Sequence, residues 1–262
     1  MIEYIEQVIS ELRQRQPLVL NLTNYVTMDF MANSLLALGA APIMTVCDDE
    51  LEELTAIAAA ININIGTLDE TFIKRCTTIT QLASHYNKPI ILDPVGAGAS
   101  SIRTRVARSL LPYASIIRGN ASEIIALAAD TNSTKGVEST HTTDEATKIA
   151  IDLAKTHHCT VFVSGPIDFI TDGTRQTKVP YGSSLMPLVT GMGCVLTAVL
   201  AAFRGIIEDS FMASNLGAHY FTLCGELAAL ANPSLGSYKT HFIDNLYTAN
   251  FLAMKQIYIQ HG

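Results

Sequence analysis

The sequence has no tryptophan, and charged residues make up only 16% of its 262 positions. Its 17 lysines and arginines are outnumbered by 24 acidic residues, which gives a net charge of −7, and they form no cluster. Proteins that bind nucleic acid need a basic surface to attract the phosphate backbone, so nucleic acid is excluded as the main partner. A phosphate group bound by this chain must be held by backbone amides, a metal ion and a few single basic residues.

The cysteines show no pairing pattern, and no segment resembles a leader or a membrane span. Five scattered cysteines without a CxxC pair predict reduced thiols and a cytoplasmic protein. The first ten residues (MIEYIEQVIS) are acidic and amphipathic, unlike a signal peptide. The uncharged stretch 179–203 is interrupted by two prolines and three glycines, so we expect no association with a membrane.

What the sequence does contain is apolar residues, at 48% of the chain, with a mean hydropathy of +0.28. This composition is typical of a sheet covered on both faces, or of a subunit that buries surface against copies of itself. Short apolar runs alternate with segments of helical periodicity, which predicts βαβ units and a mostly parallel sheet. No composition shift marks a linker, so we predict a single α/β domain over residues 1–262 with three αβα layers.

The expected elements follow from this alternation. Strands are predicted at 18–22, 42–46, 61–65, 89–92, 115–117 and 160–163, and an Asp172-Gly173 turn predicts a hairpin of 168–171 and 176–179. Helices are predicted at 2–14, 29–38, 51–60, 69–85, 102–111, 121–129, 143–157, 195–206, 211–230 and 245–258. The polar segment 131–139 is expected to be a surface loop.

Polar and glycine residues follow the predicted strands repeatedly. The carboxyl ends of parallel strands meet at one edge of a sheet, where ligands bind, so we expect these residues to lie close together. They are Asn24, Gly66 and Thr67, Asp93, Arg118 and Ser164.

The stretch 189–203 (VTGMGCVLTAVLAAF) combines a glycine-rich turn with an apolar helix. Gly191 and Gly193 let the backbone approach a ligand, and the helix start offers free N–H groups to an anion such as phosphate. An ordinary tight turn remains the alternative. Cys194 lies in the first turn, where the helix dipole is expected to lower the pKa of its thiol. No histidine base is adjacent in sequence, so we favour a small packed residue over the nucleophile of a hydrolase.

Two further motifs carry charge at predicted strand ends. Asp93, followed by Gly96 and Gly98, indicates either a metal or phosphate site or a simple Asp-Pro turn. The segment 118–123 (RGNASE) has the spacing of a capping box between Asn120 and Glu123. Arg118 can also clamp phosphate oxygens, and Glu123 can hold Mg²⁺ through water. A basic and an acidic residue at one helix start favour a magnesium–nucleotide site.

Six segments of the chain resemble segments of the hydroxyethylthiazole kinases, a family of the ribokinase-like superfamily, and follow one another in the same order as in that family. The resemblance covers nearly the whole chain and rests on 24–30 (NYVTMDF), 35–44 (LLALGAAPIM), 64–68 (NIGTL), 92–98 (LDPVGAG), 117–123 (IRGNASE) and 189–194 (VTGMGC). It implies a ribokinase-like fold and ATP- and Mg²⁺-dependent phosphorylation of the primary alcohol of 4-methyl-5-(2-hydroxyethyl)thiazole, in thiamine biosynthesis or salvage. It also implies a cytoplasmic homotrimer with active sites between subunits.

The resemblance also implies roles for individual residues. It assigns nucleotide binding to Arg118 and Ser164, and the metal to Asp93 and Glu123. In the turn before the helix, Gly191, Gly193 and Cys194 would present backbone N–H groups to the transferred phosphoryl group, with Cys194 a weak base at most. The thiazole would contact Asn24, Val26, Met44, Gly66, Thr67 and Gly191.

Other functions remain open from the sequence. The nearest is a kinase of the same superfamily that acts on hydroxymethylpyrimidine or pyridoxal; Met44 and a backbone-rich lining favour the small uncharged thiazole. A non-catalytic nucleotide-binding sensor is a second alternative, disfavoured because binding alone does not need two carboxylates near a metal. A cysteine-dependent hydrolase is the third.

Overall fold

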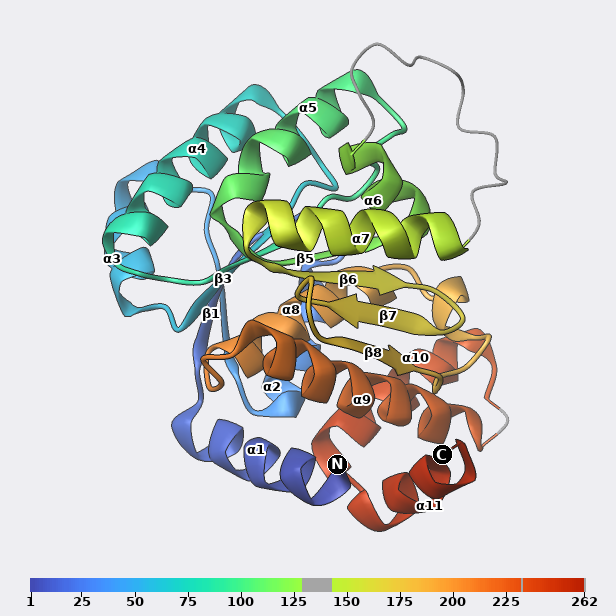
Figure 1. Ribbon diagram of the computed structural model, residues 1–262. Coiled ribbons are helices and arrows are strands. Elements are labelled where there is room, and N and C mark those ends of the chain that lie inside the picture. Colours follow the sequence, from blue (N-terminus) through green and yellow to red (C-terminus); the bar gives the residue numbers. More distant parts are fainter. Residues whose placement is uncertain (129–142, 232, 262) are drawn as a thin grey trace.

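Eight strands form one sheet in the order β2-β1-β3-β4-β5-β6-β7-β8 (Figure 1). The computed structural model describes residues 1–128, 143–231 and 233–261. Neighbouring strands are parallel from β2 through β6, and β7 and β8 are antiparallel. The strands are β1 (Leu18–Leu22), β2 (Ala41–Met44), β3 (Ala60–Asn64), β4 (Ile90–Asp93), β5 (Ala114–Asn120), β6 (Thr160–Ser164), β7 (Asp168–Thr171) and β8 (Gln176–Val179).

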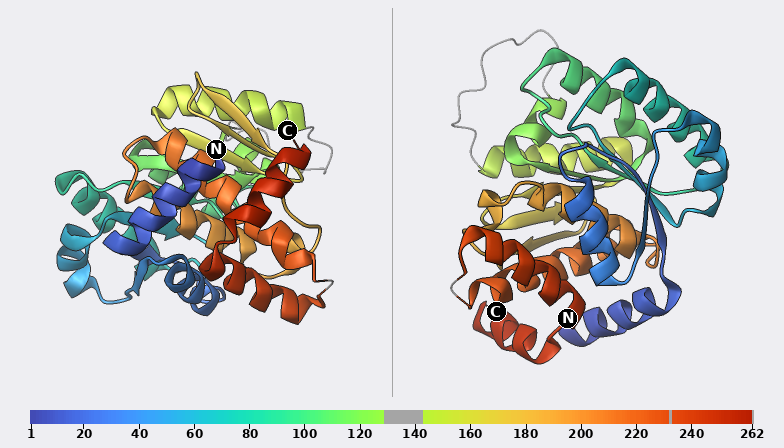
Figure 2. Two further views of the ribbon diagram at one scale, coloured as in Figure 1. Left: turned by 90° about the horizontal axis from the view of Figure 1, so that it is seen from below. Right: turned by 180° about the vertical axis from the view of Figure 1, so that it is seen from behind.

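Helices cover both faces of this sheet, as Figures 1 and 2 show. One face carries α3 (Leu51–Ile57), α4 (Glu70–His85), α5 (Ser101–Leu110), α6 (Ala121–Ala128) and α7 (Thr143–His157). The other carries α1 (Ile2–Arg15), α2 (Met28–Leu38), α8 (Met192–Arg204), α9 (Ser210–Ala229), α10 (Leu235–Thr248) and α11 (Phe251–His261). Each layer has its own apolar core against the sheet. The predicted three-layer α/β fold with a mostly parallel sheet is confirmed, including all eight strands and the hairpin.

Helix α8 runs from the apolar core to the edge of the sheet at which the central strands end. It packs against β1, β3 and β4 in the middle of the sheet and against α2 and α9 on its outer side. Ten of its residues are buried, because the run 195–203 contains only apolar and small side chains apart from one threonine. Its amino-terminal end therefore lies at the carboxyl edge of the central strands, where the polar residues gather.

The last third of the chain departs from the sequence prediction. The expected single helix over 245–258 is wrong, because α10 ends at Thr248 and α11 begins at Phe251. Ala249 stands between them in the left-handed conformation (φ 50°), and its N–H bonds the carbonyl of Asn245. The first ten residues of α10 were not predicted. Helix α3 ends at Ile57, since Ala60 already belongs to β3. The expected loop over 131–139 lies outside the described residues.

In the described part of the chain, no helix is long and apolar enough to cross a membrane. The five cysteines all lie within it, and all are free thiols, as their spacing predicts.

Replacing Gly217 should destabilise the fold, because this glycine allows the close crossing of α8 and α9. A Cβ at Gly217 would lie 2.9 Å from Cδ2 of Leu200, which is fully buried. Gly217→Ala is expected to lower the free energy of unfolding by about 1–3 kcal/mol in urea titrations, since the packed core cannot yield freely. The matched control is Gly236→Ala at the exposed start of α10, where nothing lies within 4 Å of the added Cβ. It should keep or slightly raise the stability, and equal losses in both variants would contradict the packing argument.

Candidate active site

The start of α8 is shaped by two glycines. Gly191 caps the helix with φ 90°, a conformation that side chains other than glycine rarely adopt, and a Cβ there would lie 2.7 Å from Cγ2 of Thr27. A Cβ at Gly193 would lie 2.5 Å from Nη1 of Arg118. The glycines therefore allow two neighbouring segments to approach the first turn, and one of them brings a guanidinium group to the positive end of the helix. A free anion would find both a charge and backbone donors here.

Asp93, at the end of β4, lies behind this helix start and is completely buried. Its Oδ2 accepts hydrogen bonds from Nδ2 of Asn64 and from Oγ1 of Thr197, both at 2.8 Å. Nη1 of Arg118 lies 3.9 Å from the same oxygen. The other oxygen, Oδ1, is buried and has no hydrogen-bond partner among the described residues. A buried acceptor without a donor is unfavourable, so Oδ1 provides a position for a cation or a proton donor.

Burial also controls the charge of Asp93. It raises the pKa of this carboxyl to about 6, against the opposing effect of the Arg118 guanidinium. Glu123 raises it further through its negative charge, whereas the bonds from Thr197 and Asn64 lower it. Asp93 is thus ionised at neutral pH but poorly compensated, and a bound cation would stabilise it.

Glu123 is held by backbone donors. Its Oε2 accepts from the N–H of Asn120 at 2.9 Å, and the N–H of Glu123 donates to Oδ1 of Asn120 at 2.9 Å, so the predicted capping box is present. Oε1 accepts from the N–H of Gly96 at 2.9 Å, which joins the start of α6 to the loop after β4. Each carboxylate oxygen has one such donor and keeps a further lone pair for a metal-bound water.

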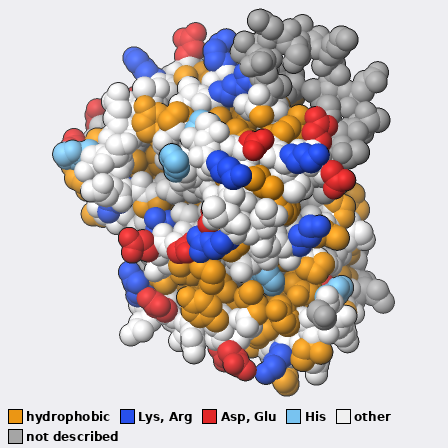
Figure 3. Space-filling model, viewed as in Figure 1, with side chains coloured by type: hydrophobic (Ala, Val, Ile, Leu, Met, Phe, Trp, Pro, Cys, Tyr) orange, Lys and Arg blue, Asp and Glu red, His pale blue; other side chains and the backbone are white. Residues whose placement is uncertain are grey.

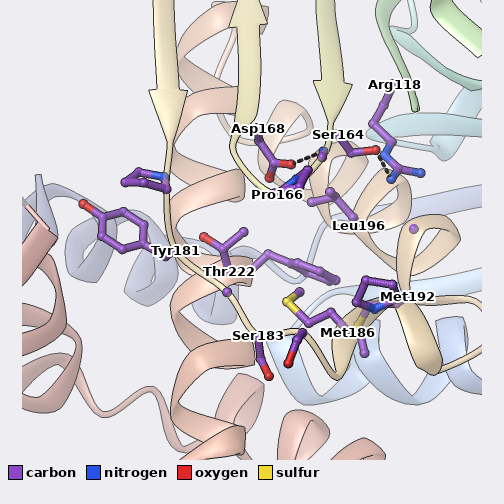
Figure 4. A pocket seen from close by; sticks show the side chains of 17 residues that line it. Arg118, Ser164, Pro166, Asp168, Tyr181, Ser183, Met186, Met192, Leu196 and Thr222 are labelled. Atoms are coloured by element: carbon purple, nitrogen blue, oxygen red, sulfur yellow. Dashed lines mark hydrogen bonds between the residues drawn. The ribbon is translucent and has the colours of Figure 1, made fainter. Parts of the chain in front are cut away.

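Beside Arg118 opens a cavity of about 680 Å³ (Figure 4). Nη2 of Arg118 donates to Oγ of Ser164 at 2.6 Å, so the two residues predicted to bind a nucleotide are in direct contact. Asp168, at the start of β7, accepts from the N–H of Gly165 at 3.0 Å, and burial raises its pKa to about 6. The rest of the lining is mostly apolar and includes Tyr181, Met186, Met192, Leu196 and Phe221. A charged end and an apolar interior suit a ligand with a phosphate and a flat ring.

On the other side of the α8 start lies an amide cluster from the ends of β1 and β3. Nδ2 of Asn24 donates to Oδ1 of Asn64 at 2.9 Å and lies 3.4 Å from Sγ of Cys194. Oδ1 of Asn64 also accepts from the N–H of Gly66 at 3.0 Å, and Oγ1 of Thr67 accepts from the N–H of Tyr25 at 3.3 Å. The sequence prediction that these strand ends converge is confirmed.

Two further residues predicted to contact the substrate, Val26 and Met44, are more exposed than the amides of this cluster. The side chain of Val26 is 70% exposed, and Met44 is half-buried at the end of the edge strand β2. Gly191 lies beside Thr27, whose N–H and hydroxyl both donate to Oδ1 of Asn24. The amide cluster is therefore bordered by exposed side chains in a single chain, in contrast to the cavity beside Arg118.

The expected lowering of the Cys194 pKa is wrong. Burial raises the pKa of this thiol above its ordinary value of 9.0, and the negative charge of Asp93 adds to the rise. Bonds to Asn64 and Asn24 and the charge of Arg118 act in the opposite direction but do not prevail. Cys194 lies in the first turn of α8 as predicted. However, the thiol is largely buried and feels the negative charge of Asp93, and both effects favour its neutral form.

Three residues that sequence analysis missed take part in the site: Asn64, Thr197 and Asp168. Asn64 contacts both Asp93 and Asn24, and Thr197 joins α8 to Asp93. A signal existed for two of them. Asn64 interrupts an apolar strand, and Thr197 is the one polar residue of the run 195–203. Asp168 gave no such signal, because a residue at the start of a hairpin strand is commonly polar.

A second cavity, of about 580 Å³, lies at the opposite edge of the sheet, near the starts of β5 and β6. Two arginines of its lining already have partners: Arg175 bonds Asp172 and Asp209, and Arg204 donates to Oγ of Ser210. The cavity at the carboxyl edge is therefore the stronger candidate for a ligand site.

The sheet order and the helices on both faces define an α/β fold similar to that of solved ribokinase-like proteins, as predicted. The solved pyridoxal kinase of Staphylococcus aureus, in complex with AMP-PCP and pyridoxal, is similar in fold. Its TM-score is 0.62 at 16% sequence identity, covering 80% of this chain and 87% of that chain. At this identity the likeness concerns the fold alone.

The chain belongs to the hydroxyethylthiazole kinase family. The model described as "Hydroxyethylthiazole kinase family" matches residues 9–250. The hydroxyethylthiazole kinase of Chlamydia abortus is 51% identical over 260 residues, which are 98% of this chain and 99% of that protein. The solved hydroxyethylthiazole kinase of Pyrococcus horikoshii OT3 has a TM-score of 0.88 at 36% identity, covering 97% of this chain and 96% of that chain. The resemblance found in the sequence is confirmed.

The raised pKa predicts how Cys194 reacts with pH. A raised pKa means that less than half of the thiol is ionised at pH 9.0, so its thiolate fraction is small at neutral pH and grows steeply above it. We expect the rate of alkylation of Cys194 by iodoacetamide to keep rising through pH 9, measured by mass spectrometry of its peptide. Exposed Cys47 serves in the same digest as the reference for an accessible thiol. A rate for Cys194 that levels off below pH 8 would contradict the burial argument.

Proposed function

We propose that this protein phosphorylates the primary alcohol of 4-methyl-5-(2-hydroxyethyl)thiazole with ATP, in thiamine biosynthesis or salvage. The observation that carries the proposal is the convergence of Asp93, Arg118 and Asn24 around the start of α8, in a chain of the hydroxyethylthiazole kinase family. Arg118 and the cavity beside it suit the nucleotide, and the amide cluster around Asn24 suits a small polar ring. We take residues 1–262 as one catalytic domain.

The chain's own groups can stabilise phosphoryl transfer by position and charge, which is where most of the catalysis of this reaction arises. The backbone N–H groups at Gly191, Gly193 and Cys194 lie at the positive end of α8. They are suited to the negative charge that develops on the transferred group. Arg118 and Ser164 can bind phosphate oxygens through their guanidinium and hydroxyl groups. Asn24, Gly66, Thr67 and Gly191, with the more exposed Val26 and Met44, would orient the alcohol.

Mg²⁺ fits the donors present. Bound with the nucleotide, it would neutralise charge on the phosphates. Asp93 offers the unpartnered oxygen Oδ1, and Glu123 offers lone pairs beyond its two backbone bonds, so Asp93 and Glu123 would hold the ion, Glu123 through water. The described residues contain no cluster of three histidine, cysteine or acidic side chains. Two carboxylates are what Mg²⁺ commonly uses when phosphates and waters complete its coordination.

The exposed side chains beside the amide cluster support a homotrimer with active sites between subunits. Val26 is 70% exposed and neighbouring Tyr25 is 57% exposed, so one chain leaves two large apolar side chains uncovered at the amide cluster. Separately, hydrophobic side chains gather in the lower half of the face in Figure 3. A partner subunit over 24–26 would bury this apolar surface and close the site. We further propose that the enzyme is cytoplasmic, in keeping with its free cysteines.

The rival substrates are the related alcohols of hydroxymethylpyrimidine and pyridoxal. The amide groups of Asn24 and Asn64 and half-buried Met44 provide neutral contacts, which favour the uncharged thiazole. The sensor alternative is less favoured, because the unpartnered oxygen of Asp93 calls for a cation that binding alone would not require.

The first test is the reaction itself. Purified protein, ATP and hydroxyethylthiazole are expected to give ADP and thiazole phosphate only when Mg²⁺ is present, as measured by coupled ADP detection and mass spectrometry of the product. Hydroxymethylpyrimidine and pyridoxal, tested at the same concentration, should react more slowly. Faster reaction with either rival would reassign the substrate, and ATP binding without any product would favour the sensor. Light scattering in the same buffer should give three times the chain mass of 28.3 kDa.

The raised pKa of Cys194 predicts that a stronger base at this position increases the rate. Cys194→Asp is expected to raise kcat if proton acceptance limits the reaction, since a carboxylate accepts a proton more readily than a thiol. Cys194→Ser is the control, because it keeps the size of the side chain without adding a base. An unchanged or lower kcat for Cys194→Asp in steady-state assays would show that the residue only shapes the turn.

A further inference from the structure

Two buried residues act on one oxygen of Asp93 and on no other carboxylate of the site. Asn64 and Asp93 are directly paired in register on β3 and β4, and their side chains meet at 2.8 Å. Thr197 approaches from α8, and its hydroxyl donates to the same Oδ2 at 2.8 Å. Both residues are completely buried. The two donors come from different layers of the fold, so the position of the carboxylate is set from two independent directions.

This arrangement leaves the two oxygens of Asp93 in different states. Oδ2 has two donors and Arg118 at 3.9 Å, whereas Oδ1 has no partner among the described residues. A carboxylate fixed by neutral donors on one oxygen presents its remaining acceptor capacity on the other. Residues that fix a metal-binding carboxylate in this way strengthen metal affinity because the ion need not order the ligand itself.

We propose that Asn64 and Thr197 are positioning residues that fix Asp93 so that Oδ1 is the atom available to the metal–nucleotide. Asn64 also contacts the amide cluster, whereas the second bond of the Thr197 hydroxyl runs to the carbonyl of Gly193 at 3.3 Å, within α8. Oδ1 of Asn64 accepts from Asn24 at 2.9 Å and from the N–H of Gly66 at 3.0 Å, the amide cluster on the substrate side. Asn64 therefore links the metal side to the substrate side through a single side chain. The inference rests on the proposed kinase function.

The two residues can be separated by their effects on binding. Thr197→Val removes the hydroxyl and keeps the shape of the side chain, so it should weaken Mn²⁺ binding in the presence of ADP by on the order of 10–100-fold. Mn²⁺ replaces Mg²⁺ because free Mn²⁺ is counted directly by electron paramagnetic resonance. Binding of the thiazole, measured by calorimetry without metal or nucleotide, should be unchanged. Thr197→Ser restores the donor and should restore the Mn²⁺ affinity.

Asn64→Leu should weaken both binding events, because Asn24 loses its acceptor when Asp93 loses its donor. The matched control is Asn62→Leu, on the same strand and equally buried, since Asn62 donates to Asn21 and not to Asp93. It should leave Mn²⁺ affinity as in the wild type. Circular dichroism and melting temperature identify variants that do not fold, and if Asn64→Leu is one of them, Thr197→Val and Thr197→Ser still decide the role of the carboxylate donor.

The outcomes distinguish this inference from the function on which it rests. Wild-type binding of Mn²⁺·ADP with equal binding by Thr197→Val would overturn the inference and leave the kinase proposal intact. Equal losses in Asn62→Leu and Asn64→Leu would show a general effect of buried asparagines and would also overturn it. A wild-type protein that binds neither Mn²⁺·ADP nor the thiazole would overturn both. The assignment is supported if Mn²⁺ affinity falls in Thr197→Val and recovers in Thr197→Ser. It also requires that Asn64→Leu, unlike the other variants, weakens the binding of both Mn²⁺ and the thiazole.

Discussion

The buried charge of Asp93 is the constraint on which the arrangement of the site depends. An ionised carboxylate removed from water is strongly unfavourable unless donors or cations surround it. Asn64 from β3, Thr197 from α8 and Arg118 from β5 supply those partners on one oxygen. These partners belong to two strands and a helix. The bonds to the Asp93 carboxylate therefore help to fix the position of α8 over the sheet. The partial compensation is visible in the pKa of Asp93, which remains raised to about 6.

The glycines at the start of α8 follow from the same requirement. Arg118 reaches Asp93 only by lying across the first turn of the helix, where a Cβ at Gly193 would meet Nη1 at 2.5 Å. The positive end of the helix and the guanidinium repel each other slightly, and the nearby carboxylate offsets that repulsion. An incoming anion would find both positive groups side by side, with one already oriented by Ser164. The contact between Arg118 and buried Asp93 therefore also places positive charge at the start of α8.

The fold and most of the site could be predicted because their signals are periodic or local. Strands such as 18–22 and 61–65 are short apolar runs between helical segments, and the Asn120–Glu123 box is a spacing rule. The break between α10 and α11 could not be predicted, since Ala249 adopts its left-handed conformation without a glycine to mark it. The pKa of Cys194 was predicted in the wrong direction because burial of the thiol raises it, together with the negative charge of Asp93, a residue about a hundred positions away. Long-range contacts of this kind leave no trace in local sequence.

The two halves of the candidate site differ in how far one chain completes them, and this difference bears on the proposed homotrimer. The cavity beside Arg118 is walled by the ends of the antiparallel strands, α8 and α9, all from one chain. The amide cluster around Asn24 is bordered by Tyr25 and Val26, which are exposed at 57% and 70%. Apolar side chains exposed beside the buried amides are unfavourable in water. This free-energy cost is removed when another protein surface covers them. A nucleotide site built within the chain and a substrate site closed between chains would account for both halves, and would make phosphorylation of the small alcohol depend on assembly.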